Sequence, residues 1–124
     1  MKLRCISNSV RMRLDKSDIR SLLETGKKEE KVSLHRSTSF TFSLVLDKKA
    51  TLPKASFNAG SLVVGLPYKQ GMEWAKNDVV SLKHVQEVDS ENSLELLIEK
   101  DFPCKDRPGE DKSNTFWELA NNEC

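Results

Sequence analysis

Apolar and polar residues alternate in short runs along most of this chain, and this period of two restricts the fold more than any other feature. The clearest runs are Val10 to Leu14, Phe40 to Leu46 and Leu94 to Glu99. Successive side chains of a β-strand point to opposite faces, so such alternation is typical of strands that bury one face. The sequence therefore predicts a domain built mainly from strands.

Two segments replace the alternation with helical spacing. Asp15 can accept a hydrogen bond at a helix N-terminus, and Gly26 can end a helix in the left-handed conformation. These two residues predict a short helix from about Lys16 to about Thr25. Pro67 suits the start of a second helix, which should carry Trp74 on its buried side.

The remaining residues form short β-prone runs separated by turn residues. The chain therefore belongs to the α+β class, with about eight short strands and two short helices. Tight turns join most of the strands, which favours mainly antiparallel pairing. A barrel-like domain and a stack of two sheets both fit this order. With 124 residues, we expect one domain over 1–104 and a C-terminal polar tail, 105–124, docked on it.

The predicted elements also fall into two similar halves, 1–51 and 52–104. Each half reads strand-strand-helix-strand-strand, so a shift of about 52 residues lays one ββαββ unit on the other. The shift places Ser9–Leu14 on Ser61–Leu66, the Leu22 helix on the Trp74 helix, and Phe42, Leu44 and Leu46 on Leu94, Leu96 and Ile98. Amphipathic elements also match by chance, and the sequence leaves both explanations open.

Charge and cysteine usage narrow the class of protein. Twenty basic and nineteen acidic residues leave a formal net charge of +1, which removes the simplest argument for a nucleic-acid partner. Cys5, Cys104 and Cys124 are an odd number without a Cys-x-x-Cys pair, which favours reduced thiols and a cytoplasmic location. No apolar run approaches the ~20 residues needed to span a bilayer, so we expect no membrane partner.

Three segments carry a resemblance to a known group of proteins: Asn8–Leu14, Glu24–Gly26 and Glu99–Cys104. They resemble a small uncharacterised bacterial family, a domain of unknown function, with an N-terminal NS(I/V)RxRL segment and a C-terminal EKDFxC segment. In that pattern an Arg and a Glu-Asp pair follow, where this chain has Arg107, Glu110 and Asp111. The family has no assigned activity, so the resemblance implies no mechanism.

The best candidate for a binding site follows the last strand. Its residues are Asp101, Cys104, Arg107, Glu110 and Asp111. A thiolate beside an arginine would have a lowered pKa and could act as a nucleophile or a metal ligand. A catalytic cysteine would need a histidine from elsewhere, and the chain has only His35 and His84. The alternative is that Cys104 packs as a small apolar group while Arg107 pairs with a carboxylate.

A second, weaker candidate is a row of basic residues near the N-terminus. Arg4, Arg11 and Arg13 can share one face of a hairpin with Lys2, and such a row could contact a phosphate backbone. The carboxylates of Glu24, Glu29 and Glu30 follow closely and could neutralise the row. Aromatic residues make up only 6%, which is poor for stacking single-stranded bases. A solvated outer face explains the row equally well.

These patterns lead to two main hypotheses about function. The first is a non-catalytic cytoplasmic binding or interaction domain with an unknown ligand or protein partner, because no acid–base or nucleophile constellation is recognisable. The second is a small enzyme or metal-dependent site that uses Cys104, Arg107 and the Glu110-Asp111 pair. No residues have the spacing of a known metal or cofactor site. Phe116, Trp117 and Leu119 form an apolar patch that could dock on the domain or form a homodimer.

Overall fold

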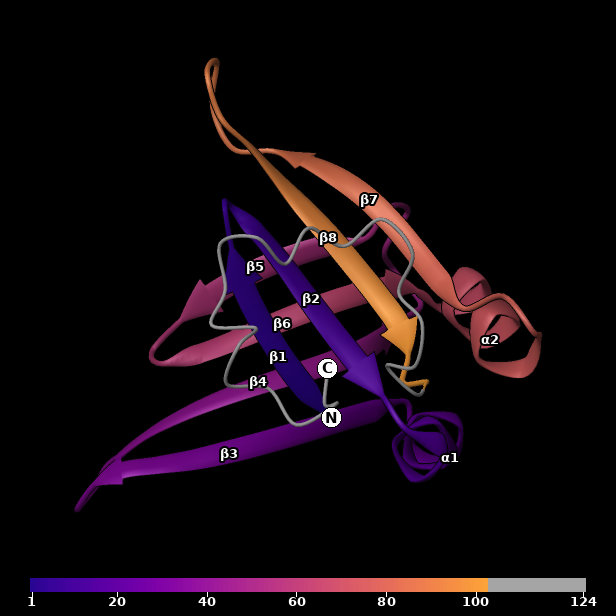
Figure 1. The fold of residues 1–124 in the computed structure, drawn as a ribbon, viewed down its shortest axis with the longest axis horizontal. Helices are drawn as coiled ribbons and strands as arrows, with labels where there is room; N and C mark the ends of the chain where they lie inside the picture. Colours follow the sequence, from indigo (N-terminus) through magenta and orange to yellow (C-terminus); the bar gives the residue numbers. More distant parts are fainter. Residues whose placement is uncertain (103–124) are drawn as a thin grey trace, which may run out of the picture.

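The computed structural model describes residues 1–102 as two four-stranded sheets that lie face to face, with two helices beside them (Figure 1). Sheet A has the order β1 (Lys2–Ile6), β2 (Ser9–Leu14), β8 (Ser93–Lys100) and β7 (Ser81–Glu87). Sheet B has the order β3 (Lys27–His35), β4 (Thr38–Asp47), β6 (Ser61–Pro67) and β5 (Lys54–Asn58). The helices are α1 (Lys16–Thr25) and α2 (Tyr68–Lys76).

The predicted α+β class is confirmed, and the two-sheet alternative is the correct one. Both sheets are open, so the barrel-like alternative is wrong. The outer pairs in each sheet are antiparallel, as expected from the tight turns. The central pairs, β2 with β8 and β4 with β6, are parallel. Each parallel pair joins strands from different halves of the chain, which local sequence patterns do not reveal.

The core lies between the two sheets and the helices. Alternate residues of β2 and β8 point inward, so Met12 and Ile98 are almost fully buried. Leu44, Val64 and Leu66 fill the facing side from sheet B. The alternation read from the sequence thus separates the core face of each sheet from its outer face. Burial of this apolar area is the main force that holds the two sheets together.

Helix α1 has the predicted ends. The Asp15 carboxylate accepts a hydrogen bond from the Asp18 N–H at 2.8 Å, and the Asp18 carboxylate accepts one from the Asp15 N–H at 2.9 Å. This reciprocal pair is a capping box. The bond from the Asp18 N–H, followed by one from the Ser17 hydroxyl, lowers the pKa of Asp15 to about 2. Gly26 ends the helix with φ of 79°.

Helix α2 is held at its C-terminus by a lysine from β8. The Lys100 ammonium group donates hydrogen bonds to the carbonyl oxygens of Trp74 and Val79, both at 2.8 Å, and to that of Asn77. It also lies 5.2 Å from the centre of the Trp74 ring, whose predicted burial is confirmed. Neither helix in the described part of the chain is long and apolar enough to cross a membrane.

The two halves have the same order of elements and the same strand pairing. Cys5 pairs with Val10, and 52 residues later Phe57 pairs with Leu62. After the helices the shift becomes 54 residues, because the connection after α2 is longer than the single Gly26 after α1. Structural pairing therefore matches Phe42 with Leu96, and the alignment of Phe42 with Leu94 expected from the sequence is wrong by two residues.

Candidate functional site

The outer face of sheet A, which points away from sheet B, gathers most of the predicted basic residues. Neither helix crosses it (Figure 1). Strand pairing aligns its outward residues in three rows across β1, β2, β8 and β7. The rows are Lys2–Arg13–Glu99–Ser81, Arg4–Arg11–Leu97–Lys83 and Ile6–Ser9–Glu95–Val85. We call this surface the basic face. The expected common face for Lys2, Arg4, Arg11 and Arg13 is thus observed.

A basin of about 410 Å³ lies over the second and third rows of the basic face. Arg4, Arg11 and Lys83 bring three positive charges to its walls, while Glu95 brings one negative charge. Its apolar lining comes from Leu97, Ile6 and Val85, and the last two are 54% and 61% exposed. The basin therefore offers cations around an apolar floor.

One buried carboxylate organises two of the arginines. Glu99 is only 5% exposed and lies 2.5 Å from Nε of Arg13 and 3.3 Å from Nε of Arg11. A single carboxylate shared by two guanidinium groups holds both side chains in place. Arg4 and Lys83 are exposed and form no ion pair within the described residues. The basin thus combines ordered and accessible cations.

The expectation that Glu24, Glu29 and Glu30 neutralise the arginines is wrong: Glu24 is exposed on α1 and forms no ion pair within residues 1–102, and the other two pair elsewhere. Glu29 pairs with Lys27 at 3.0 Å, and Glu30 contacts the Met1 amine at 3.0 Å. Both glutamates lie on β3 in sheet B, whereas the basic face belongs to sheet A. Glu99, which sequence reasoning did not connect with the arginines, takes this role instead.

Of the five binding residues predicted from the sequence, the structure describes Asp101. Its carboxylate pairs with Lys2 at 2.9 Å, and its N–H donates to the Leu14 carbonyl oxygen at 2.8 Å. The ring of the next residue, Phe102, lies 5.9 Å from the guanidinium carbon of Arg13. The chain therefore leaves β8 at the edge of the basic face. The other four predicted residues, Cys104, Arg107, Glu110 and Asp111, lie outside the described residues.

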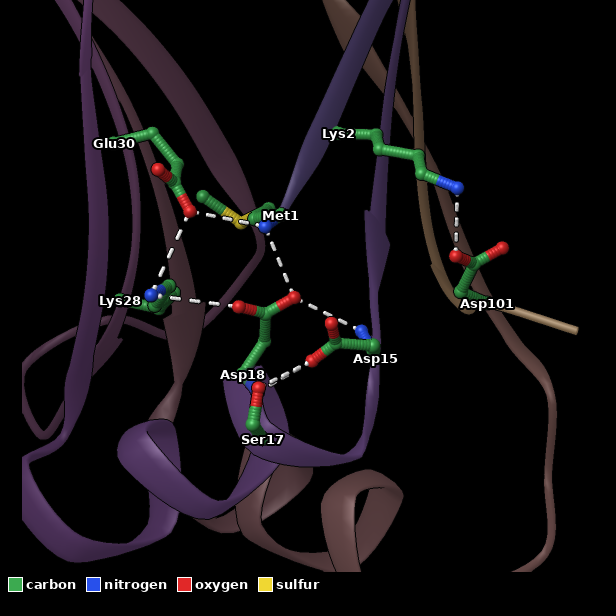
Figure 2. Close-up of polar contacts among 8 residues, drawn as sticks. All are labelled: Met1, Lys2, Asp15, Ser17, Asp18, Lys28, Glu30 and Asp101. Carbon is green, nitrogen blue, oxygen red and sulfur yellow. Dashed lines mark hydrogen bonds and ion pairs between the residues drawn. The ribbon is translucent and has the colours of Figure 1, made fainter.

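A second group of charges closes the corner between β1, α1 and β3 (Figure 2). Two carboxylates approach the Met1 amine at 3.0 Å, one from Asp18 and one from Glu30. Lys28 lies 3.4 Å from Asp18 and 3.5 Å from Glu30. Two positive and two negative groups therefore neutralise each other between the sheets. This arrangement ties the first residue to the fold and leaves no charge over for a ligand.

We predict that stability falls at alkaline pH because of this group. Burial opposes the charge on the Met1 amine, but hydrogen bonds and charge from Asp18 and Glu30 outweigh it and raise the pKa above its ordinary value of 8.0. The stabilisation is complete below pH 8 and is lost as the pH rises through the folded-state pKa. Urea denaturation between pH 7 and 10 should show this loss. An N-acetylated chain serves as the control, and an equal loss in that chain would contradict the assignment.

The histidines do not form a site with other ligands in the described part of the chain. His35 is the last residue of β3, while His84 pairs with Leu96 and shares its inward orientation on β7. Among residues 1–102 no three histidine, cysteine or acidic side chains come together in a way that could hold a metal ion. Cys5 is an exposed free thiol on β1.

The outer face of sheet B provides an internal comparison. Its strands pair in the same way, so each position of the basic face has a counterpart there. The counterparts of Arg4, Arg11, Leu97 and Lys83 are Ser56, Val63, Ser43 and Glu29. The same backbone arrangement therefore carries three cations in this row of sheet A and one anion in the matching row of sheet B, whose flanking rows carry Lys27, Lys31 and Lys54. The fold itself does not require the basic residues.

Comparisons of the sequence with known proteins identify a family without an assigned activity. No curated protein and no solved structure matches the chain. The model of a family of unknown function, DUF7009, matches residues 1–119. This match covers nearly the whole chain and confirms the resemblance to a family without an assigned activity. The chain therefore belongs to the family of unknown function DUF7009.

Proposed function

We propose that this chain is a binding domain, not an enzyme, and that its basic face binds an acidic and partly apolar segment of a partner protein. The observation that carries the proposal is the basin formed by Arg4, Arg11 and Lys83 around Leu97. Carboxylates of a partner would pair with the cations, and its apolar side chains would cover the floor. Such mixed surfaces are typical of protein interfaces, where arginine is enriched.

The comparison between the two outer faces supports this proposal. Both sheets present four strands in the same register. The position that Arg11 occupies on sheet A is nevertheless occupied by Val63 on sheet B. Exposed apolar residues such as Ile6 and Val85 contribute little to the stability of the fold. Their position beside unpaired cations is better explained by a ligand than by packing.

A peptide fits this surface better than a nucleic acid. None of the residues in the three rows is aromatic, and the nearest ring, that of Phe102, lies against Arg13 in the first row, so these rows offer bases no stacking platform. Glu95 would also repel a phosphate, whereas a peptide can place an amide or a cation beside it. Charged groups at the rim would mainly set orientation and association rate, while the apolar floor would contribute affinity.

A fluorescence-anisotropy titration tests the proposal. The probe is a short fluorescein-labelled peptide of Glu, Leu and Trp, and we expect it to bind at low salt. The variant Arg4→Ser/Lys83→Ser should weaken binding by about tenfold or more, because two accessible cations are lost. The variant Arg20→Ser/Lys69→Ser removes two exposed cations from the helices and should bind normally.

Two further probes make the result decisive. A peptide with Lys in place of Glu should not bind, because it would meet like charges in the basin. Single-stranded oligothymidylate should bind more weakly than the acidic peptide. Tight binding of the oligonucleotide without binding of the acidic peptide would overturn the proposal in favour of a nucleic-acid partner.

Two other proposals concern the context of the protein. We propose that the two halves arose by duplication of one ββαββ unit, which the matching strand registers support.

We also propose a cytoplasmic location, since the exposed thiol of Cys5 suits a compartment that keeps cysteines reduced.

A further inference from the structure

We propose that the chain's own C-terminal segment, through Phe116, Trp117, Glu118 and Leu119, occupies the basin of the basic face and competes there with an outside partner. This inference rests on the proposed function, because it names a regulator of the same surface. The four side chains belong to the part of the sequence beyond the described residues.

The first argument is the place where the described chain ends. Asp101 pairs with Lys2, and the Phe102 ring lies against Arg13, so the last described residues contact the first row of the basic face. The basin lies over the second and third rows of the same face. A segment that follows Phe102 therefore starts beside the surface that it would cover.

The second argument is reach. The first and third rows are separated by four residues along β1, or roughly 13 Å. The stretch from Pro103 to Phe116 can span roughly 40 Å when it is extended. The segment can therefore reach the basin within one molecule even if it follows an indirect path.

The third argument is chemical complementarity. Residues 103–124 contain three basic and five acidic residues, so the segment has a net negative charge. The basic face has the opposite balance, with five basic side chains and two glutamates in its rows. In the segment, Glu118 stands between Trp117 and Leu119. Cations around an apolar floor would favour a ligand of this kind, in which a carboxylate has an apolar side chain on each side.

Covalent attachment makes such an interaction strong at modest intrinsic affinity. Attachment within one chain over a short connection gives an effective concentration in the millimolar range, so a weakly binding segment can still cover the face. An outside partner would then bind only the uncovered fraction of molecules, and its apparent affinity would fall accordingly. The segment would act as a built-in competitor.

Fluorine NMR of the full-length protein labelled with fluorotryptophan tests the docking directly. The chain has two tryptophans, and Trp117→Phe assigns the two signals. We expect the Trp117 signal to show little solvent isotope shift in the native protein. The variant Arg4→Ser/Lys83→Ser should move this signal to its position in urea, while the buried Trp74 signal stays unchanged and reports an intact fold. The control Arg20→Ser/Lys69→Ser should leave both signals in place.

Other outcomes of the same experiment would overturn the inference. A Trp117 signal that is fully solvent-exposed in the native protein would show that the segment does not dock. A protected signal that appears only at high protein concentration, together with a dimeric mass, would show that the segment docks on a second copy instead.

A binding assay separates failure of this inference from failure of the proposed function. If the segment covers the face in about 90% of molecules, Trp117→Ser should raise the affinity for the acidic peptide about tenfold. Equal binding by the native protein and Trp117→Ser would overturn the competition but leave the binding face intact. No peptide binding by either protein would overturn the proposed function, while the NMR signal would still decide whether the segment docks.

Discussion

Replacing Asp18 by asparagine is expected to lower the free energy of unfolding by about 3 kcal/mol, because it breaks a buried ion pair from one side only. Asp18 is 4% exposed and contacts the Met1 amine at 3.0 Å and Lys28 at 3.4 Å. Its neutral replacement would leave two positive groups with Glu30 as their remaining partner. Asparagine keeps an oxygen that can accept the capping bond from Asp15, so the change reports the charge. Urea denaturation at pH 7 measures the loss.

Glu24→Gln is the matched control for this substitution. It removes the same charge from the same helix at an exposed position that forms no ion pair within residues 1–102, and it should change stability by less than about 0.5 kcal/mol. A loss in Asp18→Asn as small as in the control would show that the buried charge group contributes little to stability.

Leu97→Asp is expected to weaken binding of the acidic peptide by about 100-fold, because it places a carboxylate in the centre of the basin. Leu97 is half-buried and pairs with Arg11 on one side and Lys83 on the other. The new carboxylate would occupy the place proposed for the partner's own carboxylate. The flanking cations would compensate its charge, so the fold should survive. Fluorescence anisotropy measures the affinity, and circular dichroism checks the fold.

The control introduces the same residue on the other sheet. Val63 is half-buried on the outer face of sheet B, where it is the counterpart of Arg11. Val63→Asp should leave peptide binding unchanged within about twofold, since Val63 does not line the basin. Equal losses from Leu97→Asp and Val63→Asp would point to a general effect on the fold and would contradict the assigned face.

The local elements could be read from the sequence because local interactions decide them. Helix α1 begins after Asp15 and ends at Gly26, since one residue supplies a capping oxygen and the other tolerates a positive φ. Alternation in β2 separated buried Met12 from outward Arg11 and Arg13 without any knowledge of the partner strands. The common face of these arginines followed from the same period of two.

The basin could not be read from the sequence because it depends on long-range strand order. β2 lies beside β8 in a parallel pair, and this neighbour brings Leu97 and Glu99 to the arginines. Lys83 joins them from β7, across β8. Nothing local in a strand specifies a parallel partner more than eighty residues away. Glu29 and Glu30, which are close in sequence, were the wrong partners for the same reason.

The most direct test of the binding face is a map of amide chemical shifts during titration with the acidic peptide. We expect the largest shifts at Arg4, Arg11, Lys83 and Leu97, which form the second row of the basic face and line the basin. The amides of the counterpart row on sheet B should change little. Shifts concentrated on sheet B, or spread evenly over both sheets, would contradict the account.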